Sequence, residues 1–120
     1  MPGKSEHLKK AQHDEQFATS LDLHSTPYLD WLVTGMFYSA LHYIEAYFAT
    51  LKMHSPDHRI RDSAIRRDRK ISAVYNDYSE LKNFSINARY YFHPFTPADV
   101  TQNLKRHLDH LKAHILSLIQ

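Results

Sequence analysis

Apolar residues recur every three or four positions through most of the chain, a spacing that is typical of amphipathic helices. The pattern is clearest in the last segment, where Thr96 can cap a helix, Pro97 suits its first turn and Asp99 complements the helix dipole. The stripe that follows consists of Val100, Leu104, Leu108, Leu111, Ile115 and Leu118. We therefore expect a helix that begins after Thr96 and runs to the end of the chain.

A second stripe with the same spacing predicts a helix from about Lys70 to Phe92. Its members are Ile71, Val74, Tyr78, Leu81, Ser85, Ala88 and Phe92. We expect this helix to pack on the segment from Thr26 to about Met53, which opens with the Thr26–Pro27 start signal and is apolar on nearly every side. A helix without a polar face is usually buried, so this segment should form the centre of the fold.

Two further helices are predicted on weaker patterns. The segment from about Ser5 to Leu23 is amphipathic, with the imperfectly spaced apolar residues Leu8, Ala11, Phe17 and Leu21. Ser55 and Pro56 precede a short basic helix from about Asp57 to Arg67. Because the chain contains no hairpin turn, no strand-like alternation and no internal repeat, we expect an all-α fold, an antiparallel up-and-down bundle of four to five helices.

Composition limits the size and the chemistry of this fold. A chain of 120 residues with 42% hydrophobic content suits one domain, here residues 1–120, with a single core. The absence of Cys excludes disulfides, thiolate zinc sites and Cys nucleophiles. Two Gly residues are too few for a Gly-rich phosphate loop, and we expect no cofactor.

Charge and hydropathy bear on location and partners. The net charge of +2 is too small to indicate a nucleic-acid-binding protein by itself. The longest apolar run, residues 31–41, has 11 residues, short of the roughly 20 that span a bilayer. The first residues are polar and resemble no signal peptide, so we expect a cytoplasmic protein without a membrane segment.

Polar residues interrupt one face of the predicted central helix, where Tyr38, His42 and Glu45 follow each other by three and four positions. The candidate ligand-binding or polar-core residues are Tyr38, His42, Glu45, His58 and Arg59. Two interpretations stay open for them: a structural ion pair that fixes helix register, or a polar site open to a ligand.

A buried Glu45 requires a cationic partner, because an unpaired buried carboxylate costs several kcal/mol or more. We expect Arg89 as the first choice and Arg59 as the second, and Arg61 could also approach from the short basic helix.

The segment from His58 to Lys70 holds six Arg and Lys residues against two Asp residues. Forked guanidinium groups can bind phosphates, which makes this segment a candidate nucleic-acid contact. The residues concerned are Arg61, Arg66, Arg67, Arg69 and Lys70. The alternative is a solvated helix face with partial Asp pairing.

His107, His110 and His114 follow each other by three and four positions on the last helix, a spacing that permits metal chelation. No Cys and no well-placed carboxylate within that helix completes a ligand set, because Asp109 points elsewhere. We therefore expect no metal, and these histidines should line a surface or a subunit contact.

Arg89 and His93 form a candidate catalytic pair near the end of the predicted helix from about Lys70 to Phe92. An Arg can hold a phosphate while a His moves the proton of a ribose 2′-hydroxyl, which suffices for metal-independent RNA cleavage. A structural Arg and a helix-ending His explain the same two residues.

Three stretches, FYSALHYIEAYF (37–48), HSPDHRIRD (54–62) and YSELKNFSINARYY (78–91), resemble small bacterial and archaeal HEPN domain proteins. The resemblance implies a dimeric up-and-down bundle found in toxin–antitoxin, CRISPR-associated and phage-defence systems, whose active members are RNases with the motif R-x4-6-H. The matching residues here are Arg89 and His93, with only three residues between them. This shorter spacing favours binding over catalysis.

The expected function is thus a HEPN-like module that binds a nucleic acid or a nucleotide in a defence or toxin–antitoxin type system. The alternatives are a metal-independent endoribonuclease using Arg89 and His93, and a non-catalytic structural or protein-interaction subunit. We expect a homodimer, because the central helix is apolar and Leu116 and Ile119 lie off the stripe of the last helix. RNA, a nucleotide and an antitoxin or other protein are the candidate partners.

Overall fold

The computed structural model describes residues 2–120, and within them the chain is all-α, without strands. The five α-helices are α1 (Lys4–Ser20), α2 (Leu29–Thr50), α3 (His58–Arg67), α4 (Tyr75–Tyr90) and α5 (Lys105–Ile119). A 3₁₀ turn, Ser72–Val74, leads into α4, and a π-helical segment, Asp99–Leu104, leads into α5. The predicted all-α fold is confirmed.

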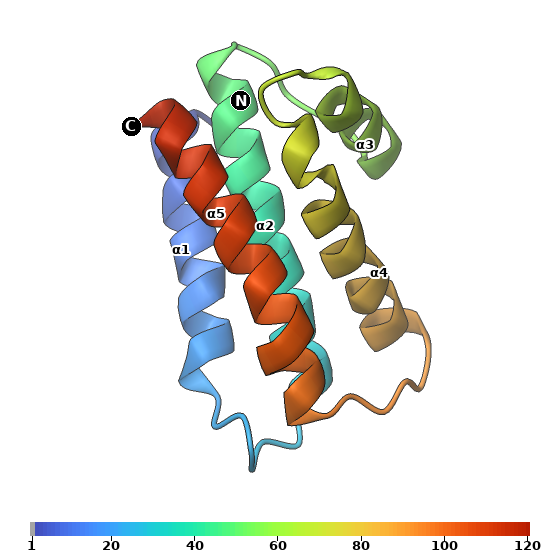
Figure 1. The fold of residues 1–120 in the computed structure, drawn as a ribbon. Helices are drawn as coiled ribbons and strands as arrows, with labels where there is room; N and C mark the ends of the chain where they lie inside the picture. Colours follow the sequence, from blue (N-terminus) through green and yellow to red (C-terminus); the bar gives the residue numbers. More distant parts are fainter. Residues whose placement is uncertain (1) are drawn as a thin grey trace.

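Four of the helices run in alternating directions along the long axis of the molecule, and α3 lies at one end beside the start of α4 (Figure 1). The central helix α2 packs against α1, α4 and α5. The molecule is elongated, with principal extents of 41 × 23 × 23 Å. Its two ends are therefore well separated, which matters for the candidate sites.

The prediction that the second segment is the buried central helix is confirmed. Val33, Phe37, Ala40, Tyr43 and Ile44 of α2 are completely buried. Removing one large side chain from such a position typically costs about 3 to 5 kcal/mol, so α2 contributes a large share of the stability.

The buried face of α1 is the predicted one only in part: Ala11 is buried, and Leu8 and Leu21 are partly buried against the core. It consists of His7, Ala11, Asp14 and Ala18, whereas Phe17 is 44% exposed. The small Ala side chains let α1 approach α2 closely, and Phe17 lies over Gly35 at the edge of that contact, 3.1 Å from where a Cβ would stand. The apolar pattern was incomplete because two of the buried residues, His7 and Asp14, are polar.

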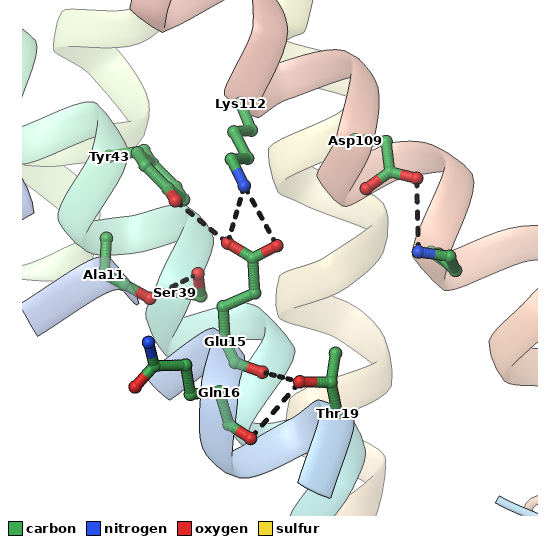
Figure 2. Close-up of polar contacts among 9 residues, drawn as sticks. Ala11, Glu15, Gln16, Thr19, Ser39, Tyr43, Asp109 and Lys112 are labelled. Atoms are coloured by element: carbon green, nitrogen blue, oxygen red, sulfur yellow. Dashed lines mark hydrogen bonds and ion pairs between the residues drawn. The ribbon is translucent and has the colours of Figure 1, made fainter. Parts of the chain in front are cut away.

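Polar contacts join α1 to α2 and α5 (Figure 2). The Ser39 hydroxyl donates to the carbonyl oxygen of Ala11 at 2.8 Å. The Glu15 carboxylate accepts from the Tyr43 hydroxyl at 2.9 Å and from Lys112 Nζ at 3.1 Å. Burial and the bond to Glu15 raise the pKa of Tyr43, so this hydroxyl stays a donor at any physiological pH.

Several helices begin at residues other than those predicted from the sequence, because contacts with neighbouring helices also determine where a helix begins. The predicted Thr26–Pro27 start lies three residues before α2, and α4 begins at Tyr75 rather than near Lys70. The reciprocal cap before the last helix is present: Thr96 Oγ1 accepts from the Asp99 N–H at 3.3 Å, and the Asp99 carboxylate accepts from the Thr96 N–H at 2.9 Å.

The two apolar surfaces on which the expected homodimer was based pack against other parts of the same chain. The apolar surface of α2 is covered by α1, α4 and α5, and Leu116 and Ile119 are partly buried against the core. Neither therefore offers the exposed strip on which that prediction was based. In the described part of the chain, no helix combines the length and apolarity that crossing a bilayer requires.

Candidate functional site

Arg89, in the last turn of α4, is a positively charged side chain whose hydrogen-bond partners are all uncharged. Its Nη1 donates to the Tyr38 hydroxyl at 2.7 Å and its Nε to the carbonyl oxygen of Ser85 at 3.3 Å. Its guanidinium also lies 5.3 Å from the centre of the Tyr90 ring. Among residues 2–120 no carboxylate reaches ion-pair distance of it. The guanidinium is thus positioned without being neutralised.

Arg89 opens onto a cleft of about 680 Å³ at the end of the bundle where α4 connects to α5. The start of α2 forms one wall, and residues 88–95 form the other. Three consecutive aromatic residues of that second wall, Tyr90, Tyr91 and Phe92, are largely or fully exposed. We call this the aromatic cleft.

A smaller hollow continues the aromatic cleft along α2. The two share Asp30, Ala88 and Arg89, and the hollow adds Trp31 and Thr34. Trp31 is 56% exposed, so this surface also carries an accessible aromatic ring.

His93 lines the aromatic cleft together with Arg89, but not in the predicted arrangement. The helix was expected to extend to Phe92, which would place the two side chains one turn apart. Instead α4 ends at Tyr90, because Pro94 disfavours helical backbone at the residue before it. His93 lies exposed in the connection, with its ring edge-on to Phe95 at 4.6 Å.

Glu45 is buried and paired with an arginine, but not with either of the two first expected. Its Oε1 accepts from Arg61 Nε at 2.7 Å, and only 2% of the residue is exposed. Arg89 contacts Tyr38 instead, and Arg59 is exposed. Successive helical residues are about 100° apart around the axis, so Arg59 and Arg61 face opposite sides of α3.

This pairing also corrects the placement of Arg61 among the nucleic-acid contacts. The residue is 7% exposed, and its guanidinium is used by Glu45 and by His58, whose Nδ1 lies 3.1 Å from Arg61 Nη1. It is part of the core.

His58 accepts the Arg61 hydrogen bond through Nδ1, so its remaining proton is on Nε2. Burial lowers the pKa of His58, and the nearby charges of Arg61, Lys82 and Arg89 lower it further. The ring is therefore a neutral donor at pH 7. It packs 5.9 Å from the Phe37 ring, whose centre is also 6.0 Å from the Arg89 guanidinium.

The polar face of α2 is divided among three neighbours rather than forming one site. Tyr38 contacts α4 through Arg89, and Glu45 contacts α3 through Arg61. His42 faces α1, where its Nδ1 lies 3.1 Å from Nδ1 of His7. Burial is the main cause that lowers the pKa of both histidines. Neighbouring charges raise or lower each pKa by smaller amounts. Sequence reasoning missed His7, since no spacing signal distinguishes it from the exposed polar residues around it.

The exposed residues of the predicted nucleic-acid contact lie together, but away from the candidate catalytic pair. Arg66, Arg67, Arg69 and Lys70 are exposed at the end of α3 and in the turn after it. This region and the aromatic cleft lie at opposite ends of the bundle (Figure 1). One nucleotide cannot contact both.

Two of the three histidines on α5 contact α4. Asp77 accepts from His107 Nδ1 at 2.8 Å and from His110 Nδ1 at 2.5 Å. His114 Nε2 donates to the carbonyl oxygen of Lys70 at 2.6 Å. His110 lies at the surface as expected, whereas His107 is largely buried, and the carboxylate of α4 that joins the two was not predicted. Within residues 2–120, no group of three or more His, Asp or Glu side chains is arranged to hold a metal ion.

No family model matches the chain, and no curated protein or solved structure matches it either. The resemblance to HEPN domains stays a prediction. What the chain does must be inferred from its own residues.

Proposed function

We propose that the chain is a HEPN-like module that binds single-stranded RNA or a nucleotide in the aromatic cleft, as part of a defence or toxin–antitoxin type system. The observation that supports the proposal is Arg89: a guanidinium held by the Tyr38 hydroxyl, without a carboxylate partner, at a cleft with exposed aromatic walls. Phosphate groups are good ligands for such a guanidinium, because its planar donors match two phosphate oxygens.

The aromatic residues supply the second half of the recognition. Bases stack on exposed rings without strong sequence preference, at about 1 to 3 kcal/mol per base. Tyr90, Tyr91, Phe92 and Trp31 offer four such rings near one cation. Tyr38 is a positioning residue in this proposal, since it holds Arg89 and does not itself line the cleft.

Binding can be measured through Trp31, because it is the single Trp of the chain and lies in the hollow beside Arg89. We expect a ten-nucleotide single-stranded RNA to quench its fluorescence with a salt-dependent affinity. Arg89→Gln should weaken binding at least tenfold, and Tyr91→Ser should weaken it less.

Arg106→Gln is the matched control, since Arg106 is exposed on α5 and does not line the cleft. It should change the affinity less than twofold. Equal losses in Arg89→Gln and Arg106→Gln, with both variants folded by circular dichroism, would show only general charge attraction and contradict the proposal.

A second candidate function, metal-independent RNA cleavage, is favoured by one observation: Arg89 and His93 line the same cleft. An endoribonuclease needs both the clamp and the proton-transfer group. Labelled single-stranded RNA incubated with the protein in EDTA would then be cleaved, and Arg89→Ala and His93→Ala would each abolish cleavage. A binding module would show no cleavage, and His93→Ala would leave its affinity nearly unchanged.

A further inference from the structure

We propose that a second cleft, at the opposite end of the bundle, docks an acidic amphipathic peptide segment of a protein partner. This α3 cleft has a volume of about 590 Å³ and lies between α3 and the end of α2. The inference does not depend on RNA binding at the aromatic cleft, because the two sites share no residue.

Three arginines of the α3 cleft lack a counter-charge. Arg59, Arg66 and Arg67 line it and are exposed, and no carboxylate in the described part of the chain comes within ion-pair distance of them. The one acidic residue of the cleft, Asp68, is engaged internally: its carboxylate accepts from the Tyr47 hydroxyl at 2.8 Å and from a backbone N–H at 2.7 Å. The cleft therefore presents a net positive charge.

The arginines surround an aliphatic surface. Met53 is 47% exposed and Ile60 is 38% exposed, and both line the cleft beside Ala64. The position of Met53 is fixed by the way α2 ends: Lys52 adopts a left-handed conformation with φ of 58°, and the Met53 N–H bonds to the carbonyl oxygen of Phe48 at 2.9 Å. This Schellman-type end directs Met53 back over the last turn of α2.

The chemistry of this surface favours a peptide over a nucleic acid. Bases bind by stacking on exposed aromatic faces, and the one aromatic residue that lines the α3 cleft, Phe48, is 1% exposed. Aliphatic side chains of a partner can contact Met53 and Ile60, while its carboxylates pair with the surrounding arginines. Charge complementarity thus selects a segment with two or three Asp or Glu residues around an apolar anchor.

The test is a selection of random 16-residue peptides displayed on phage against the immobilised full chain, with depletion on a triple variant, Arg59→Gln, Arg66→Gln and Arg67→Gln. We expect enriched peptides that are acidic and carry an aliphatic or aromatic anchor. The best one, made with a fluorescent label, should bind the triple variant at least tenfold more weakly than the unchanged chain by anisotropy. A variant with Met53→Ser and Ile60→Ser should show a similar loss.

Arg69→Gln is the matched control, since Arg69 is exposed close by but outside the cleft. It should change peptide affinity less than twofold. The proposal is overturned if no acidic amphipathic peptide is enriched, or if the selected peptide binds the folded triple variant as well as the unchanged chain. It is also overturned if the three substitutions weaken binding of single-stranded RNA and leave peptide binding intact.

Discussion

At the residue scale, the most consequential contact is the buried pair of Glu45 and Arg61. Both residues are almost fully buried, and Glu45 Oε2 has no partner among the described residues, so the pair is held by few bonds. Such a pair contributes little net stability compared with apolar residues of similar volume, but breaking it leaves an uncompensated charge in the core.

We therefore predict that Arg61→Met destabilises the protein by about 3 to 5 kcal/mol, because it leaves the Glu45 carboxylate buried alone. The measurement is urea unfolding followed by circular dichroism. Lys105→Met serves as the control, since the Lys105–Asp109 pair is exposed, and it should change stability by less than about 1 kcal/mol. A loss from Arg61→Met as small as that of the control would contradict the prediction.

The contact between His7 and His42 predicts a loss of stability in acid. Burial lowers the pKa of both residues below 6.5 in the folded chain, so the unfolded chain takes up protons first as the pH falls. Stability should be fully present above about pH 6.5 and decrease as the pH falls toward the lowered pKa values.

Urea unfolding at pH 7.5, 6.5 and 5.5 measures this dependence. His42→Asn should flatten it, whereas His24→Gln, at an exposed position in the connection between α1 and α2, should leave it unchanged. If the stability of the His42→Asn variant decreased as steeply with falling pH, other groups would cause the pH dependence and the prediction would be wrong.

At the scale of the helices, sequence patterns predicted the order and type of all five: a nearly all-apolar segment for α2, apolar stripes for α4 and α5, a weaker amphipathic pattern for α1, and a start signal at Ser55 and Pro56 for α3. The ends were less predictable, since they depend on neighbours: residues 70–74 form a turn and a 3₁₀ segment rather than the first turns of α4. The candidate site was predictable only in part. That Glu45 needs an arginine follows from chemistry, but choosing Arg61 requires knowing which side of α3 faces the core.

The end of α2 gives a prediction at this scale. Lys52 has a positive φ of 58°, a conformation that costs a residue with a Cβ about 1 kcal/mol relative to Gly. Lys52→Gly should therefore raise the unfolding free energy by about 0.5 to 1 kcal/mol, measured by urea unfolding. Lys52→Ala keeps the strain and should give no such gain, so equal gains in both variants would refute this explanation.

At the scale of the whole molecule, the fold separates two chemically different clefts along an axis of 41 Å. One end offers aromatic rings and Arg89; the other offers three arginines around aliphatic residues. The sequence assigned Arg89 to a catalytic pair, Arg59 to the polar core and Arg66 and Arg67 to a nucleic-acid contact, but distance along the chain does not reveal that α4 runs away from α3 for its whole length (Figure 1).

The homodimer stays a prediction, but it now requires a different surface. Exposed large apolar residues remain elsewhere, among them Phe17, Leu51 and Leu118, whereas Leu116 and Ile119 are packed on the core. Light scattering at micromolar concentration should return twice the mass of the chain. A monomer mass for the unchanged protein would refute the prediction.

The π-helical segment before α5 has a consequence for how the chain tolerates changes in length. The Lys105 N–H bonds to the carbonyl oxygen of Val100, five residues back, so this turn holds one residue more than an α-helical turn. Deleting the exposed Gln102 would convert it to an ordinary turn and leave the later part of α5 in register with the core. Deleting the exposed Arg106 would instead rotate every later side chain by about 100°, including the buried Leu111 and Ile115. Between residue 99 and the end of α5, a one-residue deletion should therefore preserve the fold at residues 99–104 and disrupt it further along.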